Sequence, residues 1–76
     1  MNNARRKAIK KIAEQLDILK SEFEALKDEE QEAFDNMPES LQSSERGEHM
    51  EAVIYNMEEV LENLESAFDG MDTLED

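Results

Sequence analysis

The chain lacks several residue types on which whole classes of function depend. Its 76 residues include no cysteine, no tryptophan, one histidine, one proline and two glycines. Without cysteine there is no disulfide, thiolate metal site or thiol nucleophile, and nothing calls for an oxidising compartment. The single histidine, His49, has no acid and nucleophile spaced as a hydrolytic triad requires. The composition therefore predicts a non-enzymatic protein with no catalytic residue and no cofactor.

Long hydrophobic runs are missing as well. The N-terminal segment is basic at Arg5, Arg6 and Lys7, but apolar and charged residues alternate after it, unlike the uninterrupted apolar segment of a signal peptide. No stretch approaches the roughly 20 apolar residues of a transmembrane helix. We therefore expect a cytoplasmic protein that does not engage a membrane.

Two acidic groups superficially match metal sites. Residues 58–62 (EEVLE) have the carboxylate spacing of helical nucleoside triphosphate pyrophosphohydrolases, in which such residues hold Mg²⁺. The second carboxylate motif of those enzymes is not recognisable downstream, and the acids would lie on the outer face of a helix. Glu45 and His49 lie one helical turn apart, but two ligands make no closed site. We predict no metal site and interpret these acids as a solvated face.

Basic residues are scarce and unevenly placed. Eight bases and 21 acids give a net charge of −13; residues 1–27 carry seven bases and four acids, whereas residues 28–76 carry seventeen acids and only Arg46 as a base. This charge would repel phosphates over most of the surface, so direct nucleic-acid binding is not expected. Apolar and charged residues each make up 38% of the chain, a balance that favours disorder unless the apolar residues are patterned.

The apolar residues are patterned, at alternating spacings of three and four, in two segments. The first row is Ile9, Ile12, Leu16, Leu19, Phe23 and Leu26, and the second is Met50, Ile54, Met57, Leu61, Leu64, Phe68 and Met71. This spacing indicates two amphipathic helices with coiled-coil-like seams. Pro38 and a cluster of turn formers separate them. The sequence thus predicts one domain, 1–76, with helix 1 over about 4–35, a loop over 36–44 and helix 2 over about 45–72.

An antiparallel helical hairpin is the economical all-α fold for two helices of similar length joined by a short loop. Pro38 is expected to open one short turn of helix, with Leu41 tucked under the hairpin. Ser43 or Ser44 is expected to cap helix 2.

Folding at the loop predicts three further contacts. Gly47 lies on the second seam, where a glycine would leave room for Phe34 or for the loop. Glu30, the odd charge on the first seam, would lie beside Arg46 and His49, which would neutralise it. The basic N-terminal end would lie along the acidic C-terminal end; the residues concerned are Arg5, Arg6, Lys7, Lys10 and Lys11 with Asp69, Asp72, Glu75 and Asp76.

A chain this short buries a small fraction of its surface, which favours self-association. A further apolar row on helix 2, together with one residue of helix 1, predicts a homodimer in which two hairpins form a four-helix bundle. These residues are Val53, Val60, Ala67, Leu74 and Ile18. The same row would alternatively dock a helix of a different protein.

Helix 2 also carries a nearly continuous row of acids, interrupted at Tyr55. The row consists of Glu48, Glu51, Glu58, Glu62, Glu65, Asp69 and Asp72. Carboxylates repeated along a rigid helix approximate the charge spacing of a nucleic-acid strand, which predicts a basic, nucleic-acid-binding protein as the partner. The alternative is a face that only keeps the protein soluble.

Residues 28–48, DEEQEAFDNMPESLQSSERGE, resemble the signature of small acidic proteins of bacterial phages and prophages. The similarity extends over both helices, although its specificity lies in the loop and its flanks. That group has no assigned activity, so the resemblance implies only a phage or mobile-element setting and hence the host cytoplasm. Two hypotheses follow: an acidic dimer that inhibits or modulates a basic host protein, and a structural or assembly accessory with a solubilising acidic face.

Overall fold

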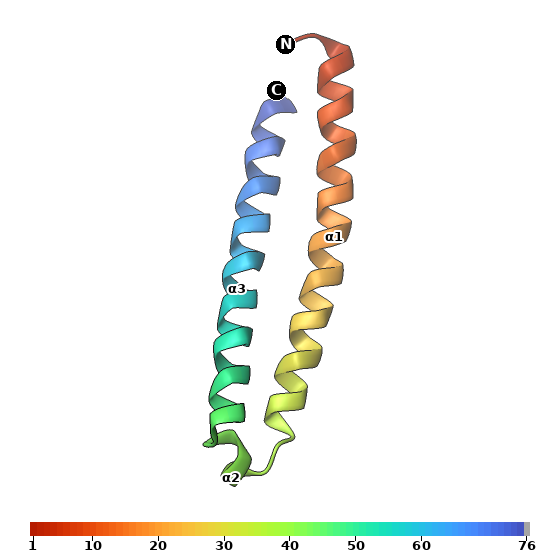
Figure 1. The fold of residues 1–76 in the computed structure, drawn as a ribbon. Coiled ribbons are helices and arrows are strands. Elements are labelled where there is room, and N and C mark those ends of the chain that lie inside the picture. The colour runs from red at the N-terminus through yellow and green to blue at the C-terminus, as the bar shows by residue number, and fades with distance from the viewer. Residues whose placement is uncertain (76) are drawn as a thin grey trace.

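A computed structural model describes residues 1–75 as two long helices packed side by side in opposite directions. Helix α1 spans Asn3–Asp35 and α3 spans Glu45–Asp72; the short helix α2, Glu39–Gln42, joins them, and the 3-10 turn η1, Thr73–Glu75, follows α3. The start of α1 and the end of α3 lie at one end of the hairpin and α2 at the other (Figure 1). The predicted all-α fold is confirmed, since the described residues contain no strand.

The hairpin is a thin rod with very little interior. Its dimensions are 58 × 14 × 13 Å and its radius of gyration is 17.4 Å, against about 11 Å for a compact domain of this length. Within residues 1–75 the only buried apolar side chains are Ala13, 4% exposed, and Ile54, 5% exposed. The other apolar side chains are half-buried or exposed, so much of the apolar pattern is left without a partner inside one chain.

Side-chain caps fix the starts of both long helices. Asn2 accepts a hydrogen bond from the backbone N–H of Arg5 at 2.8 Å. Ser44, one of the two predicted caps, accepts from the N–H of Gly47 at 3.3 Å and donates to the carbonyl of Leu41. Such caps satisfy backbone donors that have no partner in the first turn of a helix. Pro38 precedes the short helix α2, as the sequence predicts.

Gln42, and not Leu41, ties the loop to the hairpin. The prediction that Leu41 tucks underneath is wrong, because its side chain is exposed. Instead, the side-chain amide of Gln42 donates to the backbone carbonyls of Phe34, at 3.0 Å, and Met37, at 3.2 Å, at the end of α1. Sequence reasoning missed this residue, because one glutamine in a polar loop belongs to no periodic pattern.

Gln42→Ala is expected to lower the free energy of unfolding by about 1–3 kcal/mol, because the carbonyl of Met37 loses its side-chain donor and that of Phe34 keeps only backbone donors. Gln15→Ala is the matched control: Gln15 is exposed on α1, and a change within about 0.5 kcal/mol is expected. Urea denaturation followed by far-UV circular dichroism measures both. Equal changes for the two variants would show that the Gln42 bonds contribute nothing.

The predicted seam of α3 is confirmed, and that of α1 is half wrong. All seven predicted seam residues of α3 are buried or half-buried. On α1, Ile9, Leu16 and Phe23 are half-buried as expected, but the three residues between and after them are exposed, namely Ile12, Leu19 and Leu26. Their places toward α3 are taken by the residues that follow each of them: Ala13, Lys20 and Lys27.

The two lysines fit between the helices because their long apolar stems can be covered while their ammonium groups reach the edge. The Lys20 ammonium lies 5.7 Å from the centre of the Phe68 ring and 3.9 Å from a carboxylate oxygen of Asp17. The Lys27 ammonium lies 3.0 Å from a carboxylate oxygen of Asp28. Each lysine therefore packs against α3 and keeps a counter-charge from α1.

Two predicted charge contacts are not formed. Glu30 is half-buried, but Arg46 and His49 are exposed, and neither makes an ion pair with it in the part of the chain that the structure describes, so that prediction is wrong. The basic N-terminal end does lie at the same end of the rod as the end of α3 (Figure 1). Among the described residues, however, no ion pair within 4.0 Å joins its bases to Asp69 or Asp72. The Glu75 side chain and Asp76 lie outside the described residues.

Gly47 makes room for the loop. A Cβ atom at this position would overlap the backbone carbonyl oxygens of Leu41 and Gln42. The residue is buried at the first turn of α3, directly against α2. Of the two predicted uses of this glycine, room for Phe34 or room for the loop, the structure therefore shows the second.

Candidate functional site

The seven acids predicted on helix 2 form one exposed strip along α3, which we call the acidic stripe: Glu48, Glu51, Glu58, Glu62, Glu65, Asp69 and Asp72. In heptad notation, Ile54 and Met57 of the α3 seam occupy positions a and d. Four stripe residues then fall at position e, directly after a d residue, and three at position b, directly after an a residue. Positions b and e are neighbours on one side of a helix, so the stripe is continuous except at Tyr55, which occupies one of the b positions.

Carboxylates of α1 extend this surface. On α1, Ala13 and Lys20 occupy position a, and Leu16 and Phe23 occupy position d. In an antiparallel helix pair, e positions of both helices lie on the same side of the pair, and on α1 these include Asp17 and Glu24. The pKa of Lys27 is raised above its ordinary value by its hydrogen bond with Asp28, and the nearby carboxylates Glu58 and Glu24 act in the same direction. Carboxylates of both helices thus surround the ammonium group of a lysine whose stem is partly covered.

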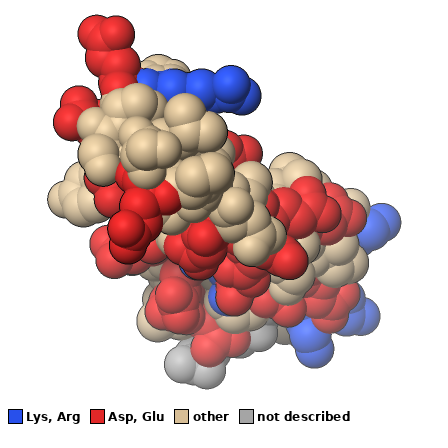
Figure 2. All heavy atoms as spheres, turned by 90° about the horizontal axis from the view of Figure 1, so that it is seen from below, with Lys and Arg blue, Asp and Glu red and all other residues tan. Residues whose placement is uncertain are grey.

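We call this side of the hairpin the acidic face; it comprises the acidic stripe with Asp17, Glu24 and Asp28. Figure 2, which looks at the rod from the loop end, shows carboxylates spread over much of the surface, with few basic side chains between them. The sequence shows the α3 part directly. The α1 part depends on how the helices are rotated against each other, which the sequence did not establish.

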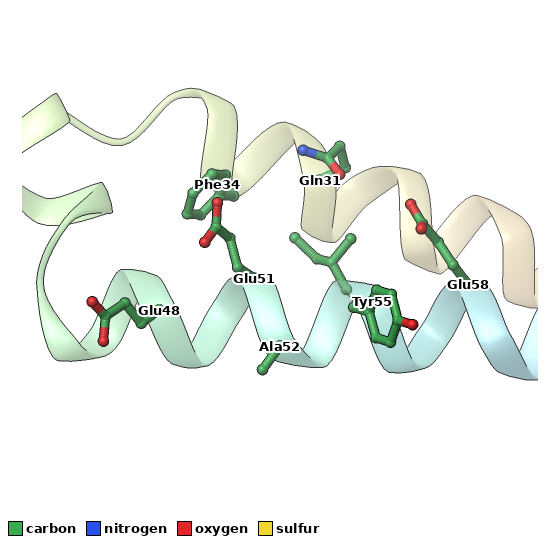
Figure 3. A pocket seen from close by; sticks show the side chains of 8 residues that line it. Gln31, Phe34, Glu48, Glu51, Ala52, Tyr55 and Glu58 are labelled. Carbon is green, nitrogen blue, oxygen red and sulfur yellow. The ribbon is translucent and has the colours of Figure 1, made fainter.

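A groove lies between α1 and α3 at the loop end of the acidic face. Its volume is about 540 Å³, and it is lined by Gln31, Phe34, Glu48, Glu51, Ala52, Ile54, Tyr55 and Glu58. Glu51 and Glu58 reach from α3 toward α1, with Glu51 beside Phe34, whereas Ala52 points away (Figure 3). Apolar side chains from both helices therefore lie beside carboxylates in one hollow.

This combination suits a lysine or arginine side chain. Its apolar stem would lie against Phe34 and Ile54 while its cation meets the carboxylates of Glu51 and Glu58. The exposed ring of Tyr55 lies within the same hollow and offers a cation–π contact. In the sequence Tyr55 interrupts the acidic row, and that interruption is the one signal that could have located the groove.

The predicted dimer residues do not all share one surface. Val53, Val60, Ala67 and Leu74 form one row along α3, in which only Val53 is half-buried and the others are exposed. Ile18 is 59% exposed, but it occupies heptad position f, on the side of α1 that points away from α3. Ile18 is therefore not on the surface that carries the α3 row.

No protein-family model matches the chain, and no curated protein or solved structure matches it either. Over residues 1–75, neither long helix contains a stretch apolar enough to cross a bilayer. The same residues bring no three histidine or carboxylate side chains together in a way that could hold a metal ion. The role of the protein is therefore inferred from how charged and apolar side chains are arranged on its surface.

Proposed function

We propose that the protein is a non-enzymatic, dimeric interaction module whose acidic face binds a basic, nucleic-acid-binding protein and blocks or modulates it. The observation that supports this most is the groove, where Phe34 and Tyr55 lie beside Glu51 and Glu58. In the phage setting that the loop resemblance implies, the partner is a host protein and the module its inhibitor.

The length of the acidic stripe supports such a partner. From Glu48 to Asp72 it covers 24 helical steps, or about 36 Å at about 1.5 Å per residue. One turn of duplex DNA measures about 34–36 Å. A basic surface that follows one turn of duplex would therefore meet carboxylates along its whole length.

The distribution of basic residues also supports a basic partner. Like charges one helical turn apart cost a few tenths of a kcal/mol per pair. In the described residues the bases found within 4.0 Å of acids are Lys20 and Lys27, and both pair with carboxylates of α1. A basic partner would relieve the repulsion along α3. A face that served solubility alone would gain nothing from an aromatic groove within it.

Neutralising the middle of the stripe is expected to weaken partner binding by about 100-fold, because several charge pairs at the contact are lost together. The variant is Glu58→Gln/Glu62→Gln/Glu65→Gln. Its matched control, Glu32→Gln/Glu45→Gln/Glu59→Gln, removes the same charge from exposed positions off the acidic face and should change binding by less than about threefold.

The measurement is affinity capture from host lysate with mass spectrometry, followed by titration of the captured basic protein at low and high salt. Binding through the acidic face should weaken steeply as salt rises, because screening removes its attraction. If both triple variants retain the same basic proteins equally, the stripe only solubilises the chain, and the role as a structural or assembly accessory takes the place of inhibition. Circular dichroism should show the same helix content for the wild type and both triple variants.

A further inference from the structure

The hairpin leaves apolar side chains of both helices uncovered. On α1 these are Ile12, Leu19 and Leu26, seven residues apart and all exposed. On α3 they are Val53, Val60, Ala67 and Leu74, also seven residues apart, of which only Val53 is half-buried. A spacing of seven keeps each row on one line along a helix of a coiled-coil pair.

The two rows lie on the same face of the hairpin. Ile12 and Leu19 each directly precede an a-position residue, Ala13 or Lys20, so they occupy position g. Val53 and Val60 precede Ile54 and Leu61 and occupy position g of α3. In an antiparallel pair the g positions of both helices lie on one side and the e positions on the other. We call this surface, made of the seven side chains of the two rows, the apolar face; it lies opposite the acidic face.

The apolar face also departs from the charge of the rest of the chain. Although 21 of 76 residues are acidic, the g positions of α3 and the neighbouring c positions hold no acid: Arg46, His49, Val53, Asn56, Val60, Asn63, Ala67, Gly70 and Leu74. On α1 only Glu22 and Glu29, at position c, flank the face. If this side of α3 faced solvent, it would be expected to carry carboxylates like the rest of so acidic a chain.

The exposed area of the hairpin exceeds that of a compact protein by about the area of one protein interface. The accessible surface is 5,790 Å² for a mass of 8.8 kDa, whereas a compact monomer of that mass exposes about 4,800 Å². The excess is about 1,000 Å², and a standard protein interface buries about 800 Å² on each partner. One face-to-face contact would therefore bring the exposed area per chain close to that of an ordinary small protein.

We infer that a second copy of this chain covers the apolar face, so that two hairpins form a four-helix bundle with both acidic faces outward. This inference rests on the self-association in the proposed function and is independent of the basic partner. It places the contact on both helices, with Ile12, Leu19 and Leu26 as partners of the α3 row. Ile18 lies outside the contact.

Two orders of helices would bring the two apolar faces together. If α1 packed over α1 of the second copy, the two would run in opposite directions and the loops would lie at opposite ends of the bundle. If α1 packs over α3 of the second copy, which is the order we infer, Glu22 and Glu29 meet a flank that carries Arg46 and His49 and no acid. A twofold axis along the rod produces the second order, and it sets the two loops at the same end of the bundle.

Adjacent residues of α1 test the inference. Leu19→Glu puts a carboxylate on the apolar face, and Ile18→Glu puts one on the far side of the same helix; the wild-type side chains are 56% and 59% exposed. By sedimentation equilibrium, the wild type should have twice the 8.8 kDa mass of one chain. Leu19→Glu should raise the dissociation constant by about 100-fold or more, and Ile18→Glu by less than about threefold.

Leu19→Ala, which keeps a good helix former, provides a milder second variant and should weaken the dimer by about tenfold. Circular dichroism checks that each variant remains helical. A helical wild type that stays monomeric at all concentrations overturns the inference, as does equal dissociation by Leu19→Glu and Ile18→Glu. These measurements of dimerisation need no basic partner. The triple variant Glu58→Gln/Glu62→Gln/Glu65→Gln should lose partner binding but stay dimeric. A failure of the dimer inference can therefore be told apart from a failure of the proposed partner binding.

The order of helices has its own test. Because the chain has no cysteine, Ser40→Cys, in the exposed helix α2, accepts a single spin label at the loop end. Double electron–electron resonance should give a label separation well under half of the 58 Å length of the rod. A separation near that full length means loops at opposite ends and overturns the packing of α1 over α3.

Discussion

Ile54→Ala is expected to lower the free energy of unfolding by about 2–5 kcal/mol, the usual range for deleting most of a buried isoleucine side chain. Ile54 is 5% exposed and shares the described interior with one other buried apolar residue, Ala13. A domain of this size is held together by only about 3–5 kcal/mol. The substitution should therefore leave a large part of the chain unfolded at room temperature.

The same substitution at Ile18 is the control, because it removes the same atoms from a side chain that is 59% exposed. A change within about 0.5 kcal/mol is expected there. Urea denaturation followed by far-UV circular dichroism, repeated at several protein concentrations, separates loss of the hairpin from loss of a dimer. Similar losses at Ile18 and Ile54 would contradict the burial pattern on which the faces of the hairpin are defined.

The α3 seam could be predicted because its row carries larger apolar residues, Ile54, Leu61 and Phe68, than the neighbouring row of Val53, Val60 and Ala67. Met50, Ile54 and Met57 continue without interruption at spacings of three and four to Met71, and acids occupy the e side of this row. One rotation of the helix therefore buries the most apolar surface. The cap at Ser44 and the turn at Pro38 follow equally local rules, since the residue type and its place before a helix determine them.

The α1 seam could not be predicted in full, because two rotations of that helix are open to its central row of apolar residues. Ile9, Leu16 and Phe23 can pair with the row of Ile12 or with the row of Ala13 and Lys20. Counting apolar residues favours the first, and the structure has the second. Lysine counts as polar in such a pattern, yet its stem packs like an apolar chain when its ammonium reaches Asp17, Asp28 or the Phe68 ring.

That rotation also explains which parts of the site were missed. The stripe on α3 is visible in the sequence, because it depends on one helix alone. The groove and the α1 part of the acidic face depend on which side of α1 meets α3, so they become visible only with the structure. The same rotation moves Ile12, Leu19 and Leu26 onto the side of Val53 and Val60. The apolar pattern of α1 is then consistent with two neighbours, α3 of its own hairpin and, in the inferred dimer, α3 of a second copy.

Gly47→Ala is expected to lower the free energy of unfolding by about 1–3 kcal/mol, although alanine is the better helix former by about 1 kcal/mol. The added methyl group would overlap the carbonyl oxygens of Leu41 and Gln42, which are backbone atoms and cannot turn aside. The loop would have to move away from α3, and the hydrogen bonds of Gln42 to α1 and of Ser44 to Gly47 would be strained with it.

At Gly70, in the same helix, alanine is expected to have the opposite effect on stability. A Cβ atom there would meet nothing within 4 Å, so Gly70→Ala should raise the free energy of unfolding by about 0.5–1 kcal/mol through helix propensity alone. Thermal unfolding should then shift in opposite directions for the two variants, by about 4–8 °C per kcal/mol in a domain of this size. A stabilising Gly47→Ala would mean that α2 does not rest on the first turn of α3, and the loop-end groove would lose the support that holds Phe34 beside Glu51.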